Sequence, residues 1–282
     1  MQHVSGGFLS KNIYHWVARK FWVVAIFLLV ALACYISVGR YLVSNVDNYS
    51  SRLIQIINSE TPFTISVHRI SGIWRGLLPE LIISDAKIDF KEDFLSPVEV
   101  DQVKLSFNPI ASLFAQSPRF YEIKIYGAST RQDLLKSKPF LSKMFSSKSS
   151  FDSQWNKKIF SNIRKLSFID SVIDLRLDSS AVNIFGINFE LKRSGTKHHA
   201  QITVNSDEKR VFEFITSGAG NPYQLDSYHG DIYFFANLES HKSITMLLDF
   251  LLPPRKFNRG RIESWFSITP KNLDGQVKFL LR

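Results

Sequence analysis

The sequence has very little cysteine. Its 282 residues include one, Cys34, which lies inside an apolar run. No intramolecular disulfide can form, so a folded domain in this chain has to be stabilised by a buried core. The absence of any other thiol also excludes a cysteine nucleophile outside that run.

The motifs that indicate common enzyme classes are missing as well. There is no G-x-S-x-G turn, no P-loop and no H-E-x-x-H helix. His198 and His199 are adjacent, so on a strand they point to opposite faces and are poorly placed to share a metal. Residues 218–220 (GAG) precede no helical pattern, which indicates a turn rather than a phosphate-binding loop. We therefore expect no enzyme, no metal site and no cofactor.

Long apolar runs are scarce too, and the single one, residues 21–39, carries no charge between Lys20 and Arg40. A helix rises about 1.5 Å per residue, so this run matches the hydrocarbon core of a bilayer. It is too long for a cleaved signal peptide and no A-x-A pattern follows it. The sequence thus predicts an uncleaved transmembrane helix. Its expected anchor residues are Phe21, Trp22, Phe27, Leu28, Leu29 and Tyr35.

The charges around this run predict its orientation. Lys11, Arg19 and Lys20 precede it without any acidic residue, which places residues 1–20 in the cytoplasm and exports residues 41–282. The chain has a formal net charge of +10. A basic domain beside a bilayer is attracted to anionic headgroups, so we expect no nucleic-acid partner, even for the basic cluster at 254–261.

Beyond the anchor, residues 47–58 predict a short amphipathic helix with Asp47 as its cap. After Pro62 the apolar residues recur at every second position, which predicts strands with one apolar and one polar face. In one strand this alternation slips at Gln102, as at a bulge. The predicted strands are 63–67, 98–107, 121–126, 172–178, 184–192, 200–205, 211–216 and 231–238, and the other predicted helices are 109–115 and 240–252.

The predicted fold class is mainly β with few short helices to cover the apolar face of the sheet. Such a sheet either curls around something apolar or closes into a β-sandwich, and periodicity alone favours the sandwich. Residues 136–158 hold six lysines and seven serines. They predict a flexible solvated loop, with contact to lipid headgroups as the alternative.

The segment after the amphipathic helix resembles a known family. Residues 65–81 are similar to a strand, a W-x-G-L-x-P-x-L turn and a second strand, with Gly72, Trp74, Gly76 and Pro79 as the turn motif. Residues 100–114 and 231–275 follow in a similar order. Over most of residues 20–282 this order resembles the N-terminal region of the AsmA-like YhdP family of Gram-negative envelope proteins.

The resemblance implies a bridge-like lipid-transfer protein with no catalysis. Its curved antiparallel sheet forms a taco-like groove that starts at the inner membrane, crosses the periplasm toward the outer membrane and carries phospholipid acyl chains. An apolar wall along the groove suits those chains. Alternation then gives the expected wall residues, which are Ile65, Val67, Val103, Leu105, Phe107, Ile123, Ile125, Leu175, Leu177, Ile187, Phe189 and Leu191. A membrane-anchored structural or assembly protein with a closed core is the alternative.

Members of that family are several times longer than this chain, which ends within a strand-like stretch. Val277, Phe279 and Leu281 give that stretch an apolar face, and an unpaired strand edge tends to pair. We expect a partner at the 276–282 edge, either another envelope protein or a C-terminal continuation. The other expected partners are inner-membrane phospholipids.

Overall fold

The computed structural model describes most of the anchor and the sheet. The described residues are 7–60, 63–76, 78–90, 96–116, 119–133, 163–176, 182–206, 209–220, 229–237, 260–269 and 273–281. The predicted helix 240–252 and the predicted loop 136–158 lie outside them.

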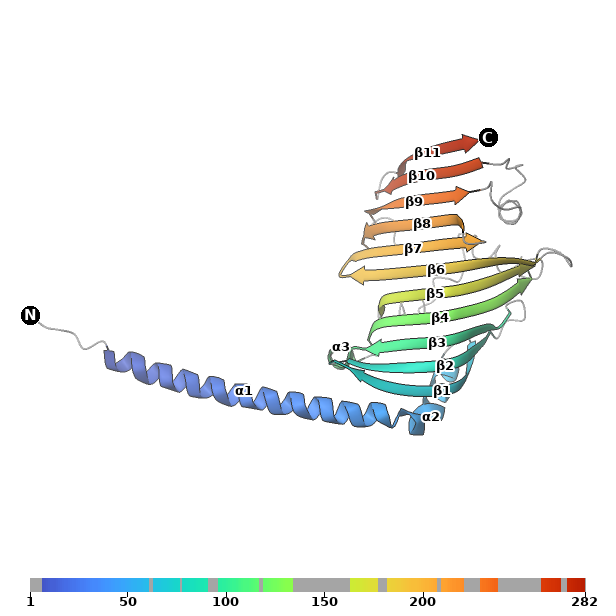
Figure 1. Cartoon of the computed structure of the whole chain (residues 1–282). Helices are drawn as coiled ribbons and strands as arrows, with labels where there is room; N and C mark the ends of the chain where they lie inside the picture. The colour runs from blue at the N-terminus through green and yellow to red at the C-terminus, as the bar shows by residue number, and fades with distance from the viewer. Residues whose placement is uncertain are drawn as a thin grey trace, which may run out of the picture.

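A long N-terminal helix, α1 (Gly7–Ser44), extends away from the sheet (Figure 1). Its segment Trp16–Tyr41 is long and apolar enough to cross a membrane once, as expected. The helix exceeds the predicted 21–39 because no proline interrupts the polar turns on either side of the run.

The predicted helix 47–58 is divided into a 3-10 turn, η1 (Val46–Tyr49), and an α-helix, α2 (Ser50–Glu60). Asn58 fastens α2 to the first strand. Its side-chain oxygen accepts a hydrogen bond from the Ile65 N–H at 2.7 Å, and its amide nitrogen donates to the Ile65 carbonyl at 3.1 Å. These bonds occupy backbone groups on the edge of the sheet that would otherwise be open.

Eleven strands form one continuous sheet in which each strand lies beside the next in sequence. The short helix α3 (Pro109–Ala115) connects the third strand to the fourth, where a helix is predicted. The strands are β1 (Phe63–Arg75), β2 (Leu78–Phe90), β3 (Val98–Phe107), β4 (Phe120–Asp133), β5 (Ile163–Arg176), β6 (Val182–Ser194), β7 (Lys197–Ser206), β8 (Lys209–Ala219), β9 (His229–Asn237), β10 (Gly260–Ile268) and β11 (Leu273–Leu281).

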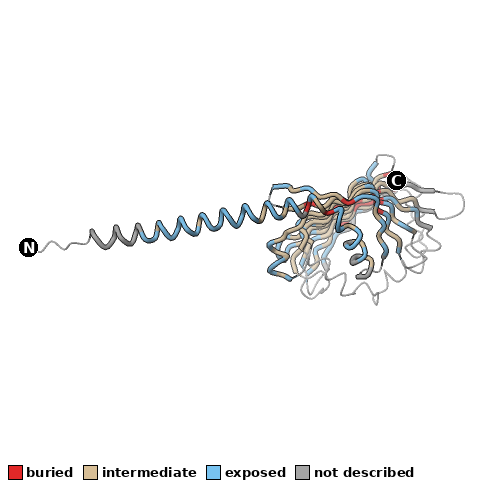
Figure 2. The backbone as a smooth tube through the Cα atoms, turned by 90° about the horizontal axis from the view of Figure 1, so that it is seen from below, coloured by how far each residue is buried: buried red, intermediate tan, exposed pale blue. Residues whose placement is uncertain are grey.

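The described strands therefore make an open curved sheet and not the two layers of a β-sandwich. Seen along the stack, the strands bend into an arch, with the buried residues along its ridge (Figure 2). This confirms the mainly β, groove-like fold.

The expectation of a wholly antiparallel sheet is wrong at one place, because β4 and β5 pair in parallel. Parallel neighbours need a connection that returns along the whole strand length. Residues 134–162 provide this connection. Every other neighbouring pair of strands is antiparallel.

A line of irregular residues, which we call the crease, crosses β2, β4 and β5. Asp85, Gly127 and Asp170 have φ angles of 53°, 60° and 52°. The ladder leaves out the pairs that these residues would make, although the register on either side of Asp85 and Gly127 is unchanged. A left-handed residue reverses the alternation of faces in its own strand. Asp101 of β3 lies between Asp85 and Gly127 in the register, so the slip near Gln102 coincides with the crease and involves no inserted residue.

Candidate functional site

One face of the sheet carries apolar residues in continuous rows across the strands. Nine residues in direct register form the first row: Ile70, Ile83, Val103, Ile125, Phe168, Phe189, Ile202, Phe214 and Phe234. A second row lies two residues away and is apolar except at Thr216: Leu81, Leu105, Ile123, Leu166, Leu191, Ala200, Thr216, Ile232 and Phe266. We call this surface, on the concave side of the arch, the inner face. Strands lie about 4.8 Å apart, so each row is roughly 40 Å long.

The inner face is only half buried. Ile125, Phe168, Phe189 and Phe214 are all partly accessible to solvent, and the Phe168 and Phe189 rings lie 5.9 Å apart in a tilted pair. In a closed core such side chains are covered on every side. The rows thus form an apolar wall that a partner of the same character can contact.

Small buried residues lie along the ridge of the arch (Figure 2). Ala86, Val100 and Ala128 form one buried cluster, and Val211 and Ala236 form another. Small side chains let the two flanks of a bent sheet approach each other. These clusters are the hydrophobic core of the described sheet, and they hold the wall in its curved shape.

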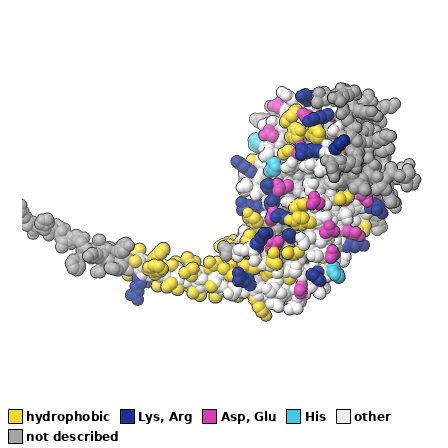
Figure 3. All heavy atoms as spheres, in the orientation of Figure 1, with side chains coloured by type: hydrophobic (Ala, Val, Ile, Leu, Met, Phe, Trp, Pro, Cys, Tyr) yellow, Lys and Arg dark blue, Asp and Glu magenta, His cyan; other side chains and the backbone are white. Residues whose placement is uncertain are grey.

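The opposite, outer face is charged, as Figure 3 shows across the sheet. Lys165 bridges two carboxylates, with its Nζ 2.9 Å from Glu122 and 3.3 Å from Glu190. Lys124 lies 3.0 Å from Glu122, and Lys192 pairs with Glu190. Alternate residues point to opposite faces, so this network and the apolar wall occupy the same strands.

The ionic network changes the pKa values of its members. Burial raises the pKa of Glu122 and of Glu190, but hydrogen bonds and charges from the neighbouring lysines outweigh it, so both pKa values are lowered from 4.5. The hydrogen bond to Glu122 raises the pKa of Lys165 above 10.5, against the opposing effect of burial. All three groups therefore keep their charges at neutral pH, on the face away from the wall.

Most of the wall residues that the sequence predicts lie on the inner face. Those with described side chains are Ile65, Val67, Val103, Leu105, Phe107, Ile123, Ile125, Ile187, Phe189 and Leu191. Leu175 pairs with Asn183 in the ladder, and Leu177 lies outside the described residues. What these residues bind stays a prediction.

The structure adds wall residues that the sequence reasoning missed. Leu166 and Phe168 belong to the first half of β5, which the predicted strand 172–178 leaves out. Ile202, Phe214 and Phe234 lie in predicted strands but are not among the predicted wall residues. The signal was present in residues 165–168 (KLSF), where polar and apolar residues alternate.

The turn motif joins the anchor to the sheet. The Trp74 ring packs edge-on against Tyr35 at 5.4 Å between centroids, and Gly39 lies directly beneath it. Gly72 touches the backbone of Val43, where a β-carbon on the glycine would overlap it. Among the expected anchor residues Tyr35 therefore contacts the sheet. Five others project freely from α1: Phe21, Trp22, Phe27, Leu28 and Leu29.

The other two motif residues shape the turn. Gly76 has a φ of 62°, which favours glycine, and Pro79 pairs with Trp74 across the β1–β2 hairpin. In the described parts of the chain no group of three His, Cys, Asp or Glu residues is arranged to hold a metal ion.

A family model described as "YhdP protein" matches residues 1–278. No curated protein matches the chain.

Proposed function

The chain belongs to the YhdP family, and from this premise we propose that it is the membrane-anchored module of a phospholipid conduit in the cell envelope. In this proposal α1 spans the inner membrane with its N-terminus in the cytoplasm, and the sheet lies in the periplasm. The Lys and Arg residues before the apolar segment support that orientation.

The observation that carries the proposal is the half-buried apolar wall. Its rows are about 40 Å long at a strand spacing of about 4.8 Å. The acyl chains of one leaflet fill half of a hydrocarbon core about 30 Å thick. A lipid tail therefore fits against the wall over its whole length, where contact removes apolar surface from water on both partners.

In the proposed mechanism, phospholipid moves along the groove without any chemical step. Tails lie against the inner face and headgroups stay in water at the open side. The rows repeat similar residues from strand to strand, so neighbouring positions hold a tail with similar free energy. Because these binding free energies are similar, a lipid can move from strand to strand without being held at one position. This movement requires no cofactor.

Site-specific photocrosslinking in the native membrane tests the groove. A benzoyl-phenylalanine in place of Phe189 should form adducts with phospholipid that mass spectrometry identifies. The same group in place of Lys87, an exposed outer-face residue of β2, is the control and should form few. Equal adducts at both positions, or none at Phe189, would contradict a lipid-filled groove and favour a structural role in envelope assembly.

A second test changes the wall itself. Ile187→Asp with Phe189→Asp places two carboxylates on the inner face and should abolish lipid adducts from a probe at Phe214. The circular dichroism of the sheet should be retained in part. Lys87→Asp is the control with an outer-face charge. If unfolding and loss of adducts always occur together, the residues form an ordinary core.

We also propose a strand partner at β11. Within the described residues this strand pairs with β10 on one side and with no strand on the other. Another envelope protein, or further sheet from a continuation of the chain, suits that edge. A full chain that stays monomeric at high concentration and captures no strand from envelope extracts would contradict this pairing.

A further inference from the structure

The sheet has one edge that faces the same way as the membrane anchor. Val43 of α1 lies against Gly72, and Gly39, one turn earlier, lies against Trp74. The apolar part of α1 therefore continues past the end of β1 at Arg75. The strand ends on this side, with the β1–β2 turn, α3 and the β6–β7 turn, form what we call the anchor rim (Figure 1).

On this rim, α3 exposes apolar side chains to an unusual degree. Ile110, Leu113 and Phe114 are 63%, 77% and 85% exposed, more than any other large apolar residue described outside α1. The helix is nevertheless well fixed. Asn108 caps it by accepting a hydrogen bond from the Ala111 N–H at 3.0 Å, and Ser112 Oγ accepts one from the Arg119 N–H at 2.9 Å.

Beside α3 lies a pocket of about 420 Å³ with three arginines, Arg119, Arg164 and Arg193, and no acidic residue in its lining. The Arg164 guanidinium stacks 5.3 Å from the centre of the Tyr121 ring, and Arg193 Nε donates to the Gly195 carbonyl at 3.2 Å. A neighbouring pocket shares Arg164 and Arg193. It adds the basic residues Lys165, Lys192, Lys197, His198 and His199, again without an acid.

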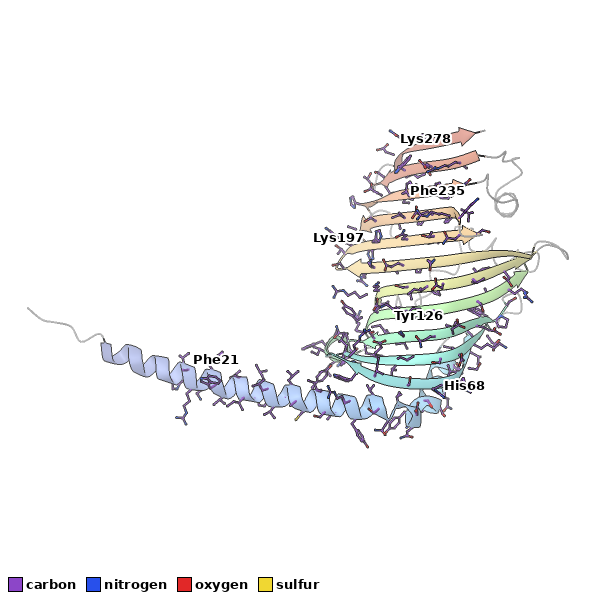
Figure 4. All side chains as sticks on the ribbon, viewed as in Figure 1. Phe21, His68, Tyr126, Lys197, Phe235 and Lys278 are labelled. Atoms are coloured by element: carbon purple, nitrogen blue, oxygen red, sulfur yellow. The ribbon has the colours of Figure 1, made fainter. Side chains whose placement is uncertain are left out.

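The arginines lie where the apolar wall ends. Arg164 and Arg193 stand two residues from Leu166 and Leu191, so alternation places them on the inner face at the rim. Lys and Arg side chains are grouped along the sheet edge on the side of α1 in Figure 3, and Figure 4 labels Lys197 there. The rim thus combines exposed apolar groups with a cluster of basic side chains.

We propose that the anchor rim docks on the phospholipid bilayer that α1 spans. Leu113 and Phe114 enter the interfacial layer, and the arginine pocket holds headgroup phosphates. Guanidinium groups bind phosphate through paired hydrogen bonds, and exposed apolar residues beside basic ones are typical of peripheral membrane contacts. The tether provided by α1 keeps the rim at a high effective concentration near that surface.

This proposal rests on the proposed function only in that α1 crosses a bilayer. It does not need lipid in the groove. If docking holds, one long edge of the groove lies at the membrane surface, so a lipid that leaves the bilayer there meets the arginines before the apolar wall.

Nitroxide quenching tests the contact on the full chain in vesicles of phosphatidylethanolamine and phosphatidylglycerol. A Cys34→Ser chain carries an environment-sensitive fluorophore on Leu113→Cys, or on Ser129→Cys near the opposite ends of the strands as control. We expect headgroup-region nitroxide lipids to quench the label at 113 at least threefold more than the label at 129. Equal quenching at the two positions overturns the proposal.

A second comparison tests how much the arginine side chains contribute to membrane docking. Arg164→Ala with Arg193→Ala should reduce quenching at 113 at least twofold in these vesicles, and much less when phosphatidylcholine replaces phosphatidylglycerol. Lys87→Ala with Arg131→Ala, far from the rim, is the matched control. If quenching of the label at 113 is the same in the arginine variant as in the unmodified protein, the arginine pocket does not hold headgroup phosphates.

The two proposals fail separately. Quenching at 113 without lipid adducts at Phe189 would support docking and contradict the conduit. Lipid adducts at Phe189 without quenching at 113 would support the conduit and contradict docking. A rim that is shielded from nitroxide and instead crosslinks to an envelope protein would overturn membrane docking in favour of a protein partner.

Discussion

At the scale of single residues, Lys165 shows how the outer face stabilises the sheet without touching the wall. It is 29% exposed and bridges Glu122 and Glu190, which are 17% and 31% exposed. Ion pairs at this degree of burial contribute more than surface pairs, which are worth about 0–1 kcal/mol. Lys165→Met should therefore lower the free energy of unfolding by about 1 kcal/mol in urea titrations at pH 7. Lys87→Met, which breaks an exposed pair with Asp89, should change it very little.

The difference in unfolding free energy between wild type and Lys165→Met depends on pH through the pKa shifts of the network. Glu122 and Glu190 have folded pKa values below 4.5, so they stabilise the fold above this pH and lose the effect as the pH falls through their folded values. Lys165 has a folded pKa above 10.5, so its contribution is lost as the pH rises through that value. The gap between wild type and Lys165→Met should shrink at both extremes. A gap that stays constant from pH 3 to 7 would contradict the ionic explanation.

Gly127 is the residue on which the crease depends most. It has a φ of 60°, and an added β-carbon would overlap the Asp101 carboxylate. Gly127→Ala should lower the free energy of unfolding by about 1–2 kcal/mol. Gly195 has a φ of 61° but open space around it, so Gly195→Ala measures the backbone strain alone. Equal losses in the two variants, measured by urea unfolding, would mean that Asp101 simply moves aside.

At the scale of elements, the joint between α1 and the β1–β2 hairpin depends on the shape of Trp74. Its indole Nε1 is buried and donates to no group in the described structure. Trp74→Phe should therefore cost less than about 1 kcal/mol, whereas Trp74→Ala should cost about 2–3 kcal/mol of apolar contact. Protease cleavage between α1 and the sheet reports the joint. If Trp74→Phe and Trp74→Ala are cleaved at comparable rates, an aromatic ring at position 74 does not stabilise the joint between α1 and the hairpin.

The elements also show what local sequence can predict. Helix α3 has the predicted bounds 109–115, and the structure shows its start fixed by the Asn108 cap and by Pro109 in the first turn. Strand β2 was expected only through the family resemblance, since Asp85 reverses its faces and breaks the alternation. The parallel pairing of β4 with β5 has no local signal, because both kinds of pairing use the same alternation.

At the scale of the whole molecule, the sequence predicted an apolar face but left its shape open. The residues that alternation singles out in 103–107 and 187–191 lie on one face of the sheet. Whether that face closes on a second sheet depends on how distant strands stack, and periodicity carries no such information. The arginine pocket was missed for a related reason, because Arg119, Arg164 and Arg193 come together only through strand order.

The crease gives strands β2 to β5 of the sheet an unequal stiffness. Along the stack, ladder hydrogen bonds join every strand to the next, so the length of the groove is fixed. Across the stack, the omitted pairs at Asp85, Asp101, Gly127 and Asp170 line up, and bending there breaks no ladder bond. We therefore expect the groove to become wider or narrower by bending at the crease, while its length along the strand stack stays the same. Such bending would let the groove take up ligands of different thickness without any change in strand pairing.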